Sequence, residues 1–93
     1  MIVSFRCKKT ERLFERSAIA PEWREIDSVA LRKLNYLHGA GKLEDLRIPP
    51  SNRLEKLKGD RKHQYSIRIN RKWRVCFELE AGNAFNVEIV DYH

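Results

Sequence analysis

Two arginines and the last three residues are the groups in this chain best suited to chemistry. Arg68 and Arg74 stand in neighbouring segments that both show strand-like patterning. A guanidinium binds a phosphate through two parallel hydrogen bonds and stays charged at physiological pH. The chain closes with an acid, a phenol and an imidazole at Asp91, Tyr92 and His93. Side chains of these three types transfer protons, so their pairing with phosphate-binding cations indicates chemistry on RNA.

The positive charge is concentrated in the middle of the sequence. The net charge is +6, and residues 47–74 carry ten Lys and Arg against only Glu55 and Asp60. This excess lies outside the predicted helices, whereas an anionic membrane surface usually attracts a basic amphipathic helix. We therefore expect a polyanionic partner and no membrane. The predicted RNA-binding residues are Arg53, Lys56, Lys58, Arg61, Lys62, Arg71 and Lys72.

Two segments near the N-terminus have helical periodicity. Thr10–Arg16 has an apolar pair surrounded by charges, which predicts a short amphipathic helix. A longer helix is predicted to begin at Pro21 and to end at Gly39 and Gly41. Its apolar residues recur at spacings of three and four, and we expect them in the core: Trp23, Ile26, Val29, Ala30, Leu34 and Leu37.

The remaining elements have the period of two that is typical of strands. Residues 1–6 are predicted to form a first strand. After the helices, a short strand ending at Lys58 and the segments 65–70, 73–79 and 85–89 continue the sheet. The expected inward residues are Tyr65, Ile67, Ile69, Trp73, Val75, Phe77, Leu79, Phe85, Val87 and Ile89. The order β-α-α-β-β-β-β predicts an α+β fold, with two N-terminal helices on one face of a mostly antiparallel sheet. Arg68 and Arg74 should lie on the other, exposed face.

Length and composition give the remaining bounds. A chain of 93 residues is expected to form a single domain over residues 1–93. No signal peptide is visible, and no apolar run reaches the roughly 18 residues of a transmembrane helix, so we expect a cytoplasmic protein. Cys7 and Cys76 stand alone, without metal-ligand spacing. We therefore predict no metal site, no cofactor and no disulfide.

The order of several short segments resembles a known family. The segments are Asn52-Arg53-Leu54-Glu55, Leu57-Lys58-Gly59-Asp60, Ser66-Ile67-Arg68-Ile69-Asn70, Trp73-Arg74 and the closing Val87-Glu88-Ile89-Val90-Asp91-Tyr92-His93. Together they resemble the HigB-type toxins, a branch of the RelE-like toxin superfamily in bacterial type II toxin–antitoxin pairs. These toxins are also called plasmid maintenance killer proteins. The resemblance extends over nearly the whole chain.

This resemblance implies a small RelE-like fold and a ribosome-dependent endoribonuclease, or mRNA interferase. Such an enzyme cleaves mRNA in the ribosomal A site without a metal and so inhibits translation and growth. The resemblance also implies a cognate HigA-like antitoxin that contains a helix-turn-helix. The toxin would then bind operator DNA only through this antitoxin.

Metal-free RNA cleavage uses the 2′-OH of the substrate as nucleophile, and it needs a base, an acid and cations for the phosphorane charge. We assign phosphate binding to Arg68 and Arg74, with Lys58 as a third cation. His93 can serve as an acid or a base near neutral pH, and Asp91 would orient its imidazole. Tyr92 is suited to stack on a base or to donate a proton.

The general base stays open between two residues. Some HigB-type toxins have a His four residues before the Gly of the Lys-Gly-Asp segment, and here that position is Glu55. A carboxylate accepts protons but also repels phosphate. Glu55 and His93 are therefore both candidates for the base.

Two other functional classes remain open on the sequence. A non-catalytic growth inhibitor that binds RNA or the ribosome would use the same cations without needing His93. A ParE-like gyrase poison would share the fold but bind a protein. Incubation with programmed ribosomes and mapping of the mRNA ends separates these classes from the nuclease.

Overall fold

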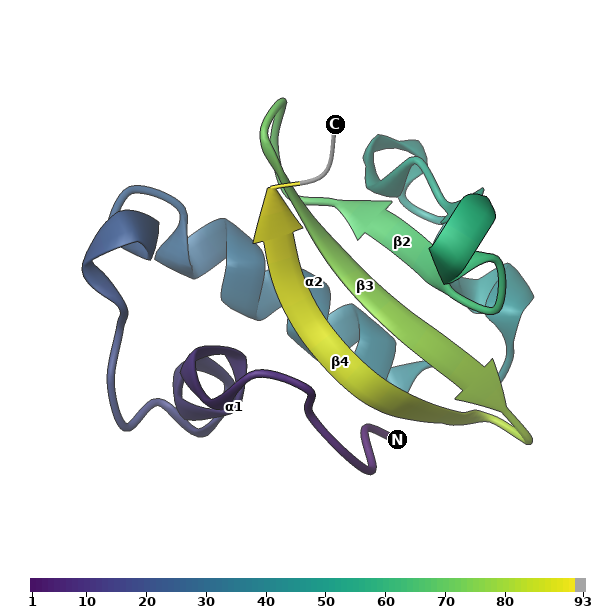
Figure 1. Cartoon of the computed structure of the whole chain (residues 1–93), viewed down its shortest axis with the longest axis horizontal. Coiled ribbons are helices and arrows are strands. Elements are labelled where there is room, and N and C mark those ends of the chain that lie inside the picture. The colour runs from purple at the N-terminus through teal and green to yellow at the C-terminus, as the bar shows by residue number, and fades with distance from the viewer. Residues whose placement is uncertain (92–93) are drawn as a thin grey trace.

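A computed structural model describes residues 1–91 (Figure 1). Helices α1 (Lys8–Glu15) and α2 (Asp27–Gly39) precede the strands, which are β1 (Glu55–Lys56), β2 (Tyr65–Arg68), β3 (Trp73–Glu80) and β4 (Asn83–Asp91). Consecutive strands pair antiparallel in the order β1-β2-β3-β4. In Figure 1, α2 crosses behind the sheet, and α1 lies next to β4. The predicted α+β architecture is confirmed.

The N-terminal segment joins the sheet less regularly than predicted. Only two isolated bridges form, in parallel with β4, at Ile2–Ala84 and Phe5–Val87. Backbone hydrogen bonds of about 3 Å accompany them, such as that from the Val3 N–H to the Ala84 carbonyl oxygen at 2.8 Å. The prediction of a regular first strand over residues 1–6 is therefore wrong. The segment still covers the outer edge of β4, which would otherwise present unpaired backbone groups.

A side chain of α1 completes the cover of that edge. Thr10 is fully buried, and its Oγ1 accepts a hydrogen bond of 3.0 Å from the backbone N–H of Ile89. A buried backbone N–H without a partner would cost roughly 1–3 kcal/mol. The helix ends where Arg16 adopts φ 61°, and the N–H of Arg16 bonds to the carbonyl oxygen of Leu13. Thr10 and Leu13 are the buried residues of α1, so one face of the helix packs against β4 and α2.

The longer helix begins later than its apolar spacing predicts. Pro21–Trp23 forms a single 3₁₀ turn, and α2 begins only at Asp27. Ile26 has φ −116° and ψ 1°, outside the α-helical region, so the chain bends at this residue. The predicted start at Pro21 is therefore wrong, whereas the end at Gly39 is confirmed. Trp23 is buried as expected, and its ring meets that of Trp73 edge-on at 6.1 Å.

A shift of register between β3 and β4 changes which residues face the core. The shift occurs around Asn86, which has φ 53° in the left-handed region. Ala84 is fully buried in the core, whereas Phe85 is only partly buried and lies outside the core cluster. The inward orientation predicted for Phe85 is therefore wrong, because an extra residue inverts the alternation. Val87 and Ile89, beyond the shift, are buried as predicted.

The outer face of the sheet is covered in its middle. Ser66 and Cys76 face this side and are nevertheless fully buried. Leu57 and Gln64 are buried as well, at the two ends of a segment that contains the 3₁₀ turn η4 (Gly59–Arg61). Figure 1 shows this turn in front of the strands. The expectation of an exposed outer face is therefore wrong for the middle of the sheet, and the open part lies near the β2–β3 hairpin.

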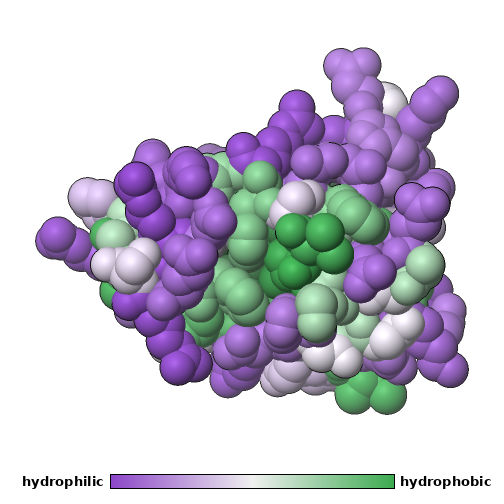
Figure 2. Space-filling model, turned by 90° about the horizontal axis from the view of Figure 1, so that it is seen from below, coloured by the Kyte–Doolittle hydropathy of each residue, from purple (hydrophilic) through white to green (hydrophobic). Residues whose placement is uncertain are grey.

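A different face of the molecule carries exposed apolar side chains. Figure 2 shows the side with α1 and the N-terminal segment, where apolar residues gather in the middle and hydrophilic residues surround them. Met1 and Val3 are both exposed.

No helix within residues 1–91 is both long and apolar enough to cross a lipid bilayer.

Candidate functional site

Arg68 and Arg74 lie directly opposite each other on β2 and β3. Cross-strand partners project on the same side of a sheet, with their Cβ atoms about 5 Å apart. The two side chains then reach in different directions. The Arg68 Nε donates to the carbonyl oxygen of Asn70 at 3.0 Å, on the hairpin. Arg74 instead reaches across β2, toward the residues that precede and begin β1.

The Arg74 guanidinium is held in place by neutral oxygens. Its Nε donates to the Ser66 Oγ at 2.7 Å, and an Nη donates to the backbone carbonyl oxygen of Arg53 at 2.7 Å. Only 11% of the side chain is exposed. Neither oxygen carries a formal charge, so these contacts fix the guanidinium without neutralising it. Such a group is preorganised for an anion at the site.

Glu55 is the carboxylate beside this arginine. Glu55 lies on β1 opposite Ser66, and its Oε1 is 3.8 Å from an Nη of Arg74. The Glu55 side chain is 55% exposed, so a ligand can reach it from solvent. We call Arg53, Glu55, Arg68 and Arg74 the arginine cluster. The structure thus brings together three predicted catalytic residues from three strands.

Asp91 lies at the same end of the sheet but pairs differently. Its partner on β3 is Trp73, whereas the partner of Arg74 is Val90. The register therefore projects Asp91 on the side of Trp73. The Asp91 Oδ2 lies 4.0 Å from the Lys72 Nζ. Tyr92 and His93, the other predicted catalytic residues, lie outside the described residues, and their roles stay predictions.

The predicted RNA-binding cations differ in their freedom to bind a ligand. Most are exposed: Arg53, Lys56, Lys58, Lys62, Arg71 and Lys72. Lys58 lies beyond the short strand β1, not within it. Arg61 is different, because its Nη1 donates to the Gln64 Oε1 at 2.8 Å and to the Glu88 Oε2 at 3.2 Å. Arg61 is therefore tied to the cover over the sheet.

Cys76 lies beneath this cover. It is fully buried, and burial raises the pKa of its thiol to about 11. A thiol with such a pKa is protonated near neutral pH and is a poor nucleophile. Within residues 1–91, no group of three or more His, Cys, Asp or Glu side chains is arranged to hold a metal ion.

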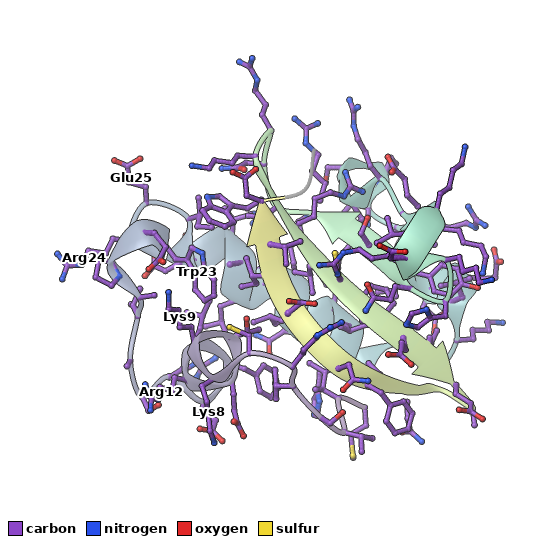
Figure 3. The ribbon with its side chains drawn as sticks, in the orientation of Figure 1. Lys8, Lys9, Arg12, Trp23, Arg24 and Glu25 are labelled. Atoms are coloured by element: carbon purple, nitrogen blue, oxygen red, sulfur yellow. The ribbon has the colours of Figure 1, made fainter. Side chains whose placement is uncertain are left out.

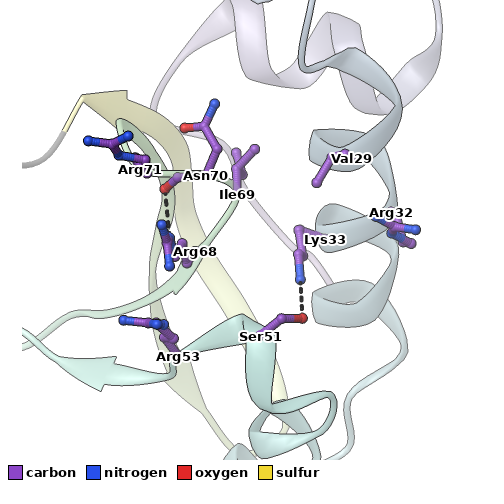
Figure 4. Close-up of a pocket in the computed structure, with 9 residues that line it drawn as sticks. All are labelled: Val29, Arg32, Lys33, Ser51, Arg53, Arg68, Ile69, Asn70 and Arg71. Carbon is purple, nitrogen blue, oxygen red and sulfur yellow. Dashed lines mark hydrogen bonds between the residues drawn. The ribbon is translucent and has the colours of Figure 1, made fainter.

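A groove of about 470 Å³ adjoins the arginine cluster (Figure 4). It lies between α2 and the β2–β3 hairpin, and we call it the basic groove. Its lining residues are Val29, Arg32, Lys33, Ser51, Arg53, Arg68, Ile69, Asn70 and Arg71. The sequence did not single out Arg32 or Lys33 as binding residues, because their position at the C-terminal half of a helix already explains a positive charge. Only packing brings them beside the hairpin.

The fold resembles solved toxin structures. A chain of the heterotetrameric YoeB–YefM toxin–antitoxin complex from Staphylococcus aureus matches with a TM-score of 0.57 and 18% identity, over 100% of this chain and 98% of that chain. The YoeB/ParE toxin from Agrobacterium tumefaciens matches with a TM-score of 0.52 and 18% identity, over 99% and 98% of the two chains. At these identities the likeness concerns the fold alone.

Sequence comparison identifies the family. The Vibrio cholerae protein Toxin HigB-1 is 38% identical over 89 residues, which is 92% of each chain. Endoribonuclease HigB from Proteus vulgaris is 31% identical over 94 aligned positions, covering both chains completely. Residues 3–93 match the family described as the RelE-like toxin of the type II toxin–antitoxin system HigB. This chain therefore belongs to the HigB-like family of RelE-like toxins.

Proposed function

We propose that this toxin is a ribosome-dependent endoribonuclease that cleaves mRNA in the ribosomal A site and thereby inhibits translation and growth. The relative from Proteus vulgaris, similar over its full length, is named an endoribonuclease. The observation that carries the proposal is the arginine cluster, where Arg74 is fixed by the Ser66 hydroxyl and the Arg53 carbonyl while Glu55 stays accessible.

The cluster is suited to stabilise a phosphorane. When a 2′-OH attacks the neighbouring phosphate, negative charge builds on the nonbridging oxygens. Arg74 offers a guanidinium whose position is set before the substrate binds, and Arg68 adds a second charge from the opposite strand. Two adjacent like charges repel each other, and an anion between them relieves that repulsion. Lys58 supplies a further exposed cation.

The proton transfers fall to the carboxylates and to the end of the chain. Glu55 lies within 4 Å of Arg74 and can accept the proton of a 2′-OH held there. His93 is the proposed acid for the departing 5′-oxygen and the alternative base, with Asp91 as its orienting partner and Tyr92 as a stacking or proton-donating group. The assignment for Tyr92 and His93 rests on the sequence motif.

An antitoxin is the partner that family membership implies, and a solved relative in fold is a toxin–antitoxin complex. We propose that the cognate antitoxin is HigA-like and carries a helix-turn-helix, so that this toxin meets operator DNA only through it. The ribosome and its mRNA are the proposed targets, and the cytoplasm is the proposed location.

Cleavage mapping on programmed ribosomes tests the proposal. Purified toxin is added to ribosomes carrying a defined mRNA, and the RNA ends are mapped by primer extension. New 5′ ends within the A-site codon, absent without ribosomes, support the nuclease. Stalled ribosomes with intact mRNA indicate a non-catalytic binder. Intact translation together with inhibited gyrase supercoiling indicates a ParE-like poison.

A further inference from the structure

The basic groove gathers cations from separate parts of the chain. Arg32 and Lys33 come from α2, Arg53 follows the turn before β1, and Arg68 and Arg71 come from β2 and its hairpin. No Asp or Glu is among its lining residues. Like charges around one hollow repel each other, and a bound anion reverses the sign of that interaction. The groove is therefore suited to an anionic ligand.

A buried lysine forms part of its wall. Only 4% of Lys33 is exposed, and its Nζ donates to the Asn52 Oδ1 at 2.6 Å and lies 3.5 Å from the Ser51 Oγ (Figure 4). Asn52 is itself fully buried, and its Nδ2 donates to the Leu46 carbonyl oxygen at 3.1 Å. Burial, followed by the charge of Arg32, lowers the pKa of Lys33. Burial of a lysine is unfavourable because its ammonium loses hydration. The fold nevertheless holds Lys33 in this wall.

The groove is continuous with the arginine cluster. Arg53 and Arg68 belong to both, and the Arg53 carbonyl oxygen is one of the two acceptors that hold Arg74. Between the cations, Val29 and Ile69 line the groove with apolar surface. A single polynucleotide strand matches this surface. Its phosphates can extend from the cluster into the groove, and its sugars and bases present apolar faces.

We propose that the basic groove binds phosphates of a single RNA strand next to the phosphate held by the arginine cluster, with Arg32 contacting them from α2 and Arg71 from the hairpin. The inference rests on the proposed function, because it takes the cluster as the place of the scissile phosphate. The volume of about 470 Å³ lies within the range of ligand clefts, about 300–1,000 Å³. The bound RNA comes from the mRNA or from the ribosomal RNA.

The test uses two double variants that remove the same charge. Arg32→Ala/Arg71→Ala alters the groove, and Arg12→Ala/Arg24→Ala is the matched control. Arg12 and Arg24 are exposed, and Figure 3 shows them at the end of the molecule with α1 and the start of α2. Binding of each protein to a fluorescent single-stranded RNA with 2′-O-methyl groups, which cannot be cut, is measured by anisotropy at several salt concentrations. Binding to empty ribosomes is measured by co-sedimentation.

For the groove variant, we expect weaker RNA binding and a shallower salt dependence. The slope of log affinity against log salt should fall by about 0.7 for each phosphate that the variant no longer binds, while the control keeps the parental slope. Loss of oligonucleotide binding identifies mRNA as the source of the phosphates. Retained oligonucleotide binding with loss of ribosome binding identifies ribosomal RNA.

Two results would overturn the inference. Equal losses in both double variants would show that net charge alone matters. Retained RNA and ribosome binding with loss of antitoxin binding, measured by calorimetry, would make the groove a protein-docking site. Circular dichroism checks that both variants fold. The proposed function and the groove can fail separately. If the parental protein does not cut mRNA, the proposed function fails, but the groove variant can still show a loss of RNA binding.

Discussion

Arg68 and Arg74 are direct cross-strand partners, yet their guanidinium groups have different neighbours. Arg74 donates to the side chain of Ser66 and to the backbone of Arg53, whereas Arg68 donates to the Asn70 carbonyl oxygen in its own hairpin. One arginine is thus locked toward β1, and the other lines the basic groove. The pair links the proposed catalytic cluster to the proposed RNA path.

Arg74 and Arg68 should differ in their effects on stability but not on cleavage. Arg74→Ala removes the partner of the fully buried Ser66, so we expect a loss of about 1–3 kcal/mol in the free energy of unfolding. Arg68→Ala should cost less. Both variants should cut mRNA roughly 10²–10³-fold more slowly, the usual effect of removing one transition-state donor. Urea unfolding and single-turnover cleavage measure the two effects. Parental cleavage in both variants would remove the pair from the site.

Lysine at position 74 should not rescue activity. An ammonium is a single point charge, whereas the guanidinium of Arg74 donates to Ser66 and Arg53 at once. We therefore expect Arg74→Lys to cleave nearly as slowly as Arg74→Ala under single-turnover conditions. A Lys variant with parental cleavage would show that charge suffices and that the fixed geometry is irrelevant.

His93 is the residue whose loss should affect chemistry without affecting the fold. We expect His93→Gln to lower single-turnover cleavage by about 10²–10⁴-fold, the usual range for a general acid or base, with a native circular dichroism spectrum and parental antitoxin affinity. Glu55→Gln should be measured in parallel as the test of the other candidate base, because the Glu55 carboxylate lies beside Arg74. If His93→Gln still cuts at the parental rate, the proton transfers pass to Glu55 and Tyr92.

The neighbours Arg61 and Lys62 should have separable roles. Arg61 bonds to Glu88, whose side chain is only 13% exposed, whereas Lys62 is exposed. Arg61→Ala removes the donor to the Oε1 of the fully buried Gln64 and leaves Glu88 with Arg6, at 3.7 Å, as an ion-pair partner. We therefore expect a loss of about 1–3 kcal/mol in stability. Lys62→Ala should leave stability within about 0.5 kcal/mol but reduce the salt dependence of ribosome binding. Equal unfolding midpoints for the two variants would contradict this division.

Asn86 should tolerate glycine but not valine. Its φ of 53° lies in the left-handed region, which costs a β-branched residue about 1–2 kcal/mol and costs glycine almost nothing. Asn86→Val should therefore unfold at a lower urea concentration than Asn86→Gly. Both variants lack the hydrogen bond from the Asn86 Nδ2 to Glu78, so its loss does not contribute to the difference between them. A valine variant as stable as the glycine variant would mean that the register shift has moved.

The thiol of Cys76 predicts a pH dependence of stability. Burial raises its pKa from 9.0 to about 11, so between these values the unfolded chain ionises and the folded chain does not. The folded state then binds more protons, and its stability falls as pH rises through this window. The Cys76→Ala variant should lack this contribution to the fall in stability with pH. Native Cys76 should also resist iodoacetamide at pH 8 and react after unfolding in urea, as mass spectrometry would show.

The sequence by itself determined the order of the two helices and of the strands that follow them, and most of the core. Spacings of three and four predicted that Ala30, Leu34 and Leu37 would face inward, and all three are fully buried. Alternation likewise predicted Ile67 and Val75 in the core, where both are fully buried. These patterns are reliable because they follow from the local periods of helix and strand, which need no knowledge of distant residues. The closing motif indicates the family without any knowledge of the geometry.

Tertiary structure alone decided the departures from those patterns and the surroundings of the site. The bend at Ile26 and the register shift at Asn86 depend on how α2 and β4 fit their neighbours, and a regular period cannot encode them. The basic groove likewise depends on tertiary packing, because Arg32 and Lys33 are far in sequence from Arg71 and all three line it. Contacts between distant segments form only when the whole core packs, because their positions are set by the combined shape of many side chains.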